Sequence, residues 1–241
     1  MGKNHLKRIA MPKTWHLPRK ETIFLARPNP GSAILAFSMP LSLVMKELIK
    51  CVKTTKEVKS ILKTKGVFVD ERRRWDDKYN VGLMDTIALP TSNEYYRLLL
   101  NANGKLDIAP ISKDEASMKL VKIVGKTILD KDHVQINLSS GRNLIVKMGE
   151  KGAGAYHVHD TLMLSLPGQQ VKQHLKFEAG CLVYLTGGKH TGKIGKLVGV
   201  NNDKTISLET PQGVYKTEKY YAFVVGKDKP VIAMPKQIIE P

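Results

Sequence analysis

The chain has 241 residues, 42% of them apolar, and no apolar run approaches the roughly 18 residues of a membrane-spanning helix. No signal peptide is expected, and two isolated cysteines argue against a disulfide framework or a zinc knuckle and for a reducing cytosol. The 39 Lys and Arg against 22 Asp and Glu give a net charge of +17, which predicts a polyanionic partner, most simply a nucleic acid.

Residues 1–40 are predicted to form an extended basic arm. They carry seven Lys or Arg against one acid, Glu21, and five prolines that exclude a long helix. Trp15 lies in the basic run, where its ring could stack on an RNA base; the alternative is a solvated tail with this ring folded back onto the body. The candidate RNA-binding residues of the arm are Lys3, Lys7, Arg8, Lys13, Trp15, Arg19 and Lys20.

The clearest helical periodicity lies in residues 41–66. Apolar residues recur every three or four positions from Leu41 to Val52, which predicts an amphipathic helix. A second helix is expected to begin at Thr54, because Glu57 three residues later completes a capping box. Gly66 is expected to end it.

A stripe of lysines runs along the second predicted helix, on the side away from its apolar face. Such a stripe is usually only solvated, but Glu57 is the one acid in this helix, so little internal pairing neutralises the charge. These lysines are therefore candidates for contacts with phosphates. They are Lys56, Lys59, Lys63 and Lys65.

The segment 67–89 is predicted to be β. Val67–Val69 and Asp85–Leu89 have the composition of short strands, and Pro90 closes the second. The residues between them are expected to begin with a turn that carries an arginine cluster. This cluster adds Arg72, Arg73 and Arg74 to the candidate RNA-binding residues.

This order of elements resembles the S-four-type RNA-binding domain (the alpha-L motif) of some ribosomal proteins, pseudouridine synthases and tyrosyl-tRNA synthetases. The family pattern is a helix ending in glycine, a V-x-V strand, a turn of the form D/N-G-K, and then G-x-x-D-x-I. The chain matches it with Gly66, Val67–Val69, Asp70 and Gly82–Ile87. It departs from the pattern at Glu71, where the family commonly has glycine.

Short strands are expected through residues 91–172, and their regular spacing indicates a small barrel or sandwich. His157 and His159 share one face of a further predicted strand, but no third ligand lies at a recognisable spacing, so no metal site is expected. The main expected strands are residues 120–125, 133–138, 143–146 and 162–167.

A glycine-rich basic loop between two apolar runs predicts a strand, a loop and a strand. Gly187–Lys193 match the first seven positions of the G-x-x-x-x-G-K-[ST] phosphate-binding loop of NTPases. However, Ile194 replaces the Ser or Thr that would hold Mg²⁺, and a β-branched run follows where a helix is required. An NTPase is therefore not expected.

The same loop resembles the KOW motif, a glycine-centred hairpin of ribosomal proteins and transcription-elongation factors with the pattern G-K-x-x-G-K-x-G-K-[VL]. The chain matches it from Gly188 to Leu197. Glycines let backbone amides approach phosphates, and lysines supply the charge whose counterion release drives binding. The loop's candidate residues are Lys189, His190, Lys193 and Lys196.

The succession of these motifs, with the N-terminal runs His5–Arg8 and Pro12–Trp15, resembles the S-four-e family of small-subunit ribosomal proteins of archaea and eukaryotes. The resemblance implies an α+β multidomain fold and a structural constituent of the small ribosomal subunit, cytoplasmic and bound to rRNA and neighbouring ribosomal proteins. It implies no catalysis, cofactor, membrane or small-molecule substrate. The implied parts are a basic arm (1–40), an S-four-like domain (41–90), a central barrel-like β domain (91–172), an SH3-like KOW β barrel (173–229) and a C-terminal tail (230–241).

Two other classes of protein carry one of these motifs. S-four-type domains also occur on RNA-modifying enzymes of the pseudouridine synthase type, which need an aspartate in an Arg-Leu-Asp setting, and the chain has no such triplet. A KOW-bearing transcription factor would not need the S-four-like unit. The enzyme remains the alternative function.

Overall fold

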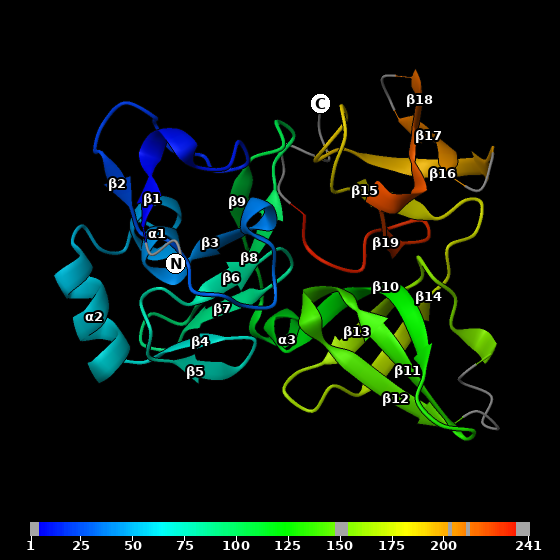
Figure 1. Cartoon of the computed structure of the whole chain (residues 1–241), viewed down its shortest axis with the longest axis horizontal. Coiled ribbons are helices and arrows are strands. Elements are labelled where there is room, and N and C mark those ends of the chain that lie inside the picture. The colour runs from blue at the N-terminus through cyan, green and yellow to red at the C-terminus, as the bar shows by residue number, and fades with distance from the viewer. Residues whose placement is uncertain (1–4, 148–153, 202–203, 211–212, 235–241) are drawn as a thin grey trace. The chain divides into compact units, whose positions relative to one another are not determined.

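The structure is a computed structural model that describes residues 5–147, 154–201, 204–210 and 213–234. The chain is mostly β with a few short helices (Figure 1), so the helical share implied by an α+β class is smaller than expected. It divides into two compact units. One comprises Met1–Asn101 with Lys105–Ser117, and the other comprises Ala102–Gly104 with Met118–Pro241.

The N-terminal segment is folded into the first unit, and the prediction of an extended arm is wrong for its described residues. β1 (Leu6–Lys7) pairs with β2 (Phe24–Leu25), and β3 (Ser38–Pro40) pairs with β6 (Asn80–Gly82). The Trp15 side chain is only 1% exposed. The segment carries its own buried apolar residues, which give it a reason to pack. These are Leu6, Met11, Trp15 and Leu17.

The first predicted helix is shorter than expected, and the second is confirmed. α1 (Leu41–Leu43) continues only as a π-helical turn, Val44–Leu48, and Lys50 has a left-handed φ of 61°. α2 (Thr55–Thr64) has the predicted capping box, with both reciprocal hydrogen bonds between Thr54 and Glu57.

A five-stranded antiparallel sheet follows in the first unit, with the order β5-β4-β7-β8-β9. The arginines expected in a turn form strand β5 instead; the turn is Asp70–Glu71, where φ is 53° and 59°. Because β8 hydrogen-bonds to β7 and β9 hydrogen-bonds to β8, this sheet runs past the boundary predicted at residue 90. Its strands are β4 (Val67–Val69), β5 (Arg72–Arg74), β7 (Thr86–Leu89), β8 (Glu94–Leu100) and β9 (Leu106–Pro110), and α3 (Lys113–Ala116) follows them.

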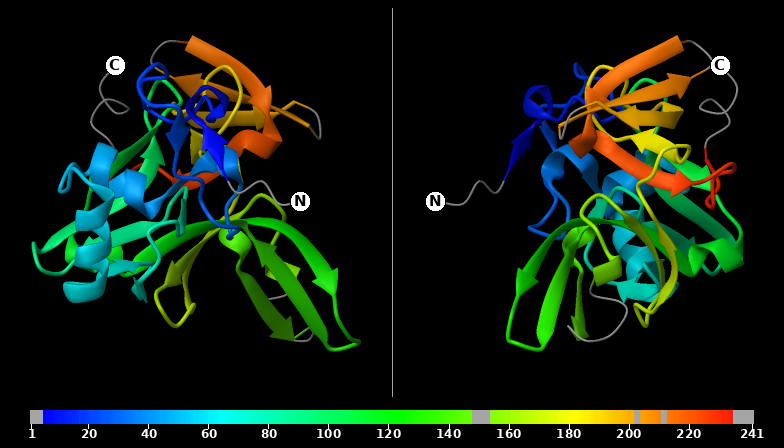
Figure 2. Two further views of the ribbon diagram at one scale, coloured as in Figure 1. Left: turned by 60° about the vertical axis from the view of Figure 1, so that its left-hand side comes forward. Right: turned by 90° about the vertical axis from the view of Figure 1, so that its right-hand side faces the viewer.

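The second unit begins with another five-stranded antiparallel sheet, ordered β12-β11-β10-β13-β14. Its long strand β10 pairs with β13 along its first half and with β11 along its second, with a register shift at Val124. Both views of Figure 2 show the green hairpin of β10 and β11 curving along its length. The strands are β10 (Met118–Ile128), β11 (His133–Leu138), β12 (Asn143–Lys147), β13 (Thr161–Ser165) and β14 (Val171–Leu175).

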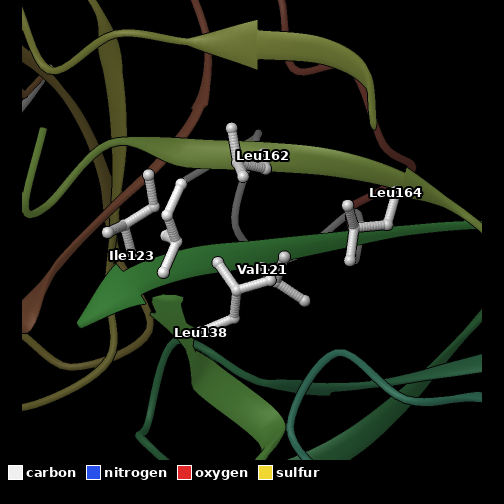
Figure 3. Close-up of a cluster of buried hydrophobic side chains, with 6 residues drawn as sticks. Val121, Ile123, Leu138, Leu162 and Leu164 are labelled. Carbon is white, nitrogen blue, oxygen red and sulfur yellow. The ribbon is translucent and has the colours of Figure 1, made fainter. Parts of the chain in front are cut away.

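Apolar side chains from β10, β11 and β13 form the core beneath this sheet (Figure 3). The residues expected to form a strand at 156–160 form a loop and turn instead, with Tyr156 packed against the core. The core cluster is Val121, Ile123, Ile136, Leu138, Leu162 and Leu164.

The last sheet of the second unit is antiparallel, with the order β18-β17-β16-β15-β19. Strand β18 was not predicted, because it alternates between exposed and half-exposed residues and lacks an apolar run. The start of the predicted C-terminal tail packs against the rest of the unit: Val231 N donates to Val225 O, and Ile232 is buried. The strands are β15 (Leu182–Leu185), β16 (Ile194–Val200), β17 (Thr205–Thr210), β18 (Gly213–Glu218) and β19 (Ala222–Gly226).

Candidate nucleic-acid interface

The outer face of α2 is a row of exposed lysines. Its inner face buries Val58 and Leu62 completely, so the amphipathic pattern separates apolar and basic sides as predicted. Lys59 Nζ lies 3.8 Å from Asp77 Oδ1, an ion pair too long and too exposed to neutralise the row. The exposed lysines are Lys56, Lys59, Lys63 and Lys65.

Strand β5 meets the C-terminal end of α2. Arg73 Nη2 donates to the backbone oxygen of Lys63 at 3.1 Å, where the helix dipole favours a cation. The guanidinium of Arg74 lies 4.2 Å from the centroid of the Tyr79 ring. Arg72 is exposed. The structure therefore brings the lysines of α2 and the arginines of β5 together on one part of the first unit.

Two candidates from the N-terminal segment are structural residues. Arg8 is 3% exposed, and its guanidinium donates to Pro18 O at 2.6 Å and to Thr22 Oγ1 at 2.9 Å and pairs with Glu21 at 2.9 Å. Trp15 Nε1 donates to Ser38 O at 2.8 Å. A guanidinium and a ring so enclosed cannot reach phosphates or bases, so both leave the candidate surface.

The remaining RNA-binding candidates of the N-terminal segment are exposed wherever the structure describes them. Lys3 lies outside the described residues. Arg19 is exposed and donates to Ile9 O at 3.0 Å. Lys7, Lys13 and Lys20 are also exposed.

The glycine-rich loop closes the hairpin of β15 and β16, as predicted. Several of its amides are used within the hairpin: Gly192 N donates to Leu185 O at 2.8 Å, and Lys193 N donates to His190 O at 3.2 Å. A strand and not a helix follows the loop, which agrees with the rejection of an NTPase. The last part of the loop, Thr191–Lys193, therefore uses its amides within the hairpin.

Close packing explains two glycines of the hairpin. A Cβ on Gly187 would lie 2.3 Å from Cδ1 of Tyr221, and a Cβ on Gly195 would lie 2.9 Å from the backbone oxygen of Glu209. Both distances are shorter than real contacts allow. Gly188 and Gly192 instead supply turns, with φ of 83° and 85°.

An aromatic ring that the sequence did not indicate supports the loop. The His190 ring stacks on Tyr215 of β18 with centroids 3.9 Å apart, and Lys193 Nζ lies 5.0 Å from the same ring centroid. Partial desolvation and the nearby charges of Lys193 and Lys189 lower the pKa of His190, which favours its neutral form. Lys189 and Lys196 are exposed and Lys193 is half-buried.

A buried cation joins the two sheets of the second unit. Lys122 of β10 is 8% exposed, and its Nζ donates to the backbone oxygens of Tyr220 and Ala222, each at 2.7 Å. Burial, and then the charge of Lys219, lowers the pKa of Lys122 to about 8. This lysine holds the fold together and faces no solvent partner.

A buried carboxylate, Asp160, follows the two histidines that the sequence placed on one strand face. It accepts from the backbone N of His157 at 3.0 Å, from His174 Nε2 at 2.7 Å and from Phe177 N at 2.9 Å. The His157 side chain is 73% exposed. Within the part of the chain that the structure describes, no group of three His, Cys, Asp or Glu could hold a metal ion.

The half-buried ring of His159 is expected to make the free energy of unfolding depend on pH. Burial, followed by the charges of Lys122 and Lys219, lowers its pKa from 6.5 to about 4. Between these pH values the unfolded chain binds a proton that the folded chain does not, so the free energy of unfolding falls as pH falls. In denaturant unfolding at a series of pH values, His159→Gln is expected to lose less stability than the wild type across this window. His157→Gln is the exposed control, and parallel curves for wild type and His159→Gln would contradict the prediction.

Comparison with protein families gives two matches. The family described as "Ribosomal family S4e" matches residues 92–171, and the domain described as "RS4NT (NUC023) domain" matches residues 1–32. Along the described ranges, no helix is long and apolar enough to cross a membrane.

Curated proteins named "Small ribosomal subunit protein eS4" are similar over nearly the whole chain. The one from Methanocaldococcus jannaschii is 40% identical over 240 residues, which cover 96% of this chain and 98% of the relative. The one from Methanocella arvoryzae is 38% identical over 234 residues, 95% of this chain and 97% of the relative. The crystal structure of 30S ribosomal protein S4e from Thermoplasma acidophilum superimposes with a TM-score of 0.67 at 27% identity, covering 79% of this chain and 96% of that one. The chain belongs to the ribosomal S4e family.

Proposed function

We propose that the protein is a structural constituent of the small ribosomal subunit that binds rRNA. The observation that carries this function is the 40% identity, over 96% of the chain, with proteins named as small ribosomal subunit proteins. The family consists of structural ribosomal proteins, so the alternative of a pseudouridine-synthase-type enzyme is not supported. The protein then resides on cytoplasmic ribosomes and contacts neighbouring ribosomal proteins.

The proposed rRNA contacts are exposed and half-buried basic side chains of three elements. In the first unit they lie on the N-terminal segment and on α2 with β5; in the second they lie on the hairpin of β15 and β16. The net charge of +17 supports such contacts, because phosphates are the polyanion that a basic surface neutralises. The proposed residues are Lys7, Lys13, Arg19, Lys20, Lys56, Lys59, Lys63, Lys65, Arg72, Arg73, Arg74, Lys189, His190, Lys193 and Lys196; Lys3 stays a prediction outside the described residues.

We further propose that the last sheet is the SH3-like barrel of a KOW domain. Its five antiparallel strands and the glycine hairpin of β15 and β16 support this assignment. The stacking of His190 on Tyr215 holds part of this loop in place, which supports the loop as a contact for phosphates. The curved sheet around β10 is proposed as the central barrel-like domain.

Sedimentation tests the ribosomal assignment. In a sucrose gradient of cell lysate at low salt, the protein is expected to travel with the small subunit, because many phosphate contacts act together. Raising the salt in the gradient is expected to release it before neutral proteins of the subunit. A protein that stays at the top of the low-salt gradient would contradict the proposed function.

A further inference from the structure

The two tryptophans of the chain differ sharply in their exposure to solvent. Trp15 is 1% exposed, whereas Trp75 is 60% exposed. A tryptophan left in water forgoes the largest burial that any side chain offers, and such side chains gather where a protein meets a partner. The exposure of Trp75 therefore calls for a ligand that covers an aromatic ring.

Trp75 is held in place and not loose on the surface. It follows β5, two residues after Arg73, so strand alternation puts both side chains on one face. The guanidinium carbon of Arg73 lies 3.8 Å from the centroid of the Trp75 ring. A stack of this kind orients the ring before any partner arrives, which lowers the entropic cost of binding.

The arginine of this stack is itself fixed by α2. Arg73 Nη2 donates to Lys63 O at 3.1 Å. A Cβ on Gly66 would lie 3.2 Å from Arg73 Nε, so the glycine that ends the helix also leaves room for the guanidinium. Arg73 and Trp75 together form a preorganised surface, called here the Arg73–Trp75 platform.

The charges around the platform favour an anionic partner. Exposed cations flank it in sequence and on the end of α2, including Arg72, Lys63 and Lys65. The acids next to it are engaged within the protein: Asp76 accepts from Lys78 N and from Asn29 Nδ2, and Asp77 lies near Lys59. Glu71 is exposed at the hairpin turn and lies beside these cations in sequence.

We infer that the Arg73–Trp75 platform stacks an unpaired base of RNA, while the surrounding cations bind the phosphates on either side of it. An aromatic ring backed by a guanidinium suits the flat face of any base, and single-stranded RNA offers bases with free faces. This inference rests on the proposed function and assigns to one surface a class of RNA, unpaired nucleotides. A docked protein is the other possible occupant, and the experiment separates the two.

The test compares two fluorescein-labelled RNAs, a hairpin with an adenine-rich unpaired loop and a fully paired duplex of the same length. Trp75→Ala in the full chain is expected to weaken hairpin binding about 5- to 100-fold, the range for one lost stacked base. Duplex binding and the salt dependence of both affinities are expected to stay unchanged, because tryptophan carries no charge. Trp75→Phe is expected to restore part of the hairpin affinity.

Two further variants serve as controls, one for the loss of a charge and one for the loss of an exposed aromatic ring. Arg72→Ala removes a charge and no ring, so it is expected to weaken both RNAs and to lower the salt slope by about 0.7–0.9. Phe24→Ala removes another exposed aromatic, 54% exposed and in edge contact with His5, and is expected to leave both affinities unchanged. Thermal unfolding by circular dichroism checks that each variant is folded.

The outcomes distinguish a failure of the base-stacking inference from a failure of the proposed function. If the wild type binds neither RNA, the proposed function is in error. If the wild type binds and Trp75→Ala retains full hairpin affinity, or loses hairpin and duplex affinity equally, base stacking is overturned. Full RNA affinity combined with loss of sedimentation with the small subunit would indicate a protein partner at Trp75 and would likewise overturn stacking.

Discussion

Trp15→Ala is expected to lower the free energy of unfolding by about 3–5 kcal/mol, the range for removing a buried aromatic ring. The ring is 1% exposed, its Nε1 donates to Ser38 O at 2.8 Å, and Trp15 also bridges Leu106 of β9. The substitution leaves a cavity in the first unit and removes the hydrogen bond to Ser38 O. We therefore expect the N-terminal segment to detach from the rest of the first unit.

Urea unfolding followed by circular dichroism measures this effect, with Trp75→Ala as the matched control. Removing the exposed ring of Trp75 is expected to change the free energy of unfolding by under about 0.5 kcal/mol. Trp15→Phe keeps most of the volume and is expected to recover much of the loss. A Trp15→Ala protein with wild-type stability and weakened RNA binding would restore Trp15 to the RNA surface and contradict its structural role.

Replacing Lys189, Lys193 and Lys196 together by Ala is expected to make the slope of log K against log salt shallower by about 0.7–0.9 for each lost phosphate contact. At physiological salt three such contacts are worth roughly 100-fold in affinity for rRNA. The reason is that the lysine side chains carry the formal charges of this hairpin, and contacts between these charges and phosphates release counterions. Titration of small-subunit rRNA at several salt concentrations measures the slope.

A second triple variant separates local contacts from overall charge. Lys131, Lys172 and Lys204 are exposed lysines of the same unit outside the glycine loop, and replacing them by Ala removes the same charge. This control is expected to leave the slope nearly unchanged. An equal loss in both triple variants would mean that only the net charge matters, and an unchanged slope in the loop variant would remove these lysines from the interface.

Local signals in the sequence predicted the elements that local interactions define. The capping box of Thr54 and Glu57 fixes the start of α2, and its hydrogen bonds span only three residues. The glycine loop between apolar runs likewise identified the hairpin of β15 and β16. In both cases the decisive partners are neighbours in the chain.

Features that depend on distant partners were missed or left open. The burial of Trp15 was only the alternative to base stacking, because it depends on Ser38 and on Leu106, far along the chain, and no periodicity near residue 15 encodes it. Strand β18 gains its place from pairing with β17, so its own polar sequence gave no signal. The exposure of Trp75 is also a property of the folded unit, although its position beside three arginines was visible in the sequence.

Lys122, which donates to the backbone oxygens of Tyr220 and Ala222, limits how far the last sheet can be separated from the preceding one. Its ammonium lies on β10, whereas the two carbonyls that it satisfies belong to the approach to β19. A fragment that begins at residue 173 would lack this ammonium and lose both hydrogen bonds, and a hydrogen bond to a charged group is worth about 1.5–3 kcal/mol. The last sheet and the preceding one are therefore joined through a single side chain, and an insertion or exchange in either sheet must keep both the ammonium and its two carbonyl acceptors.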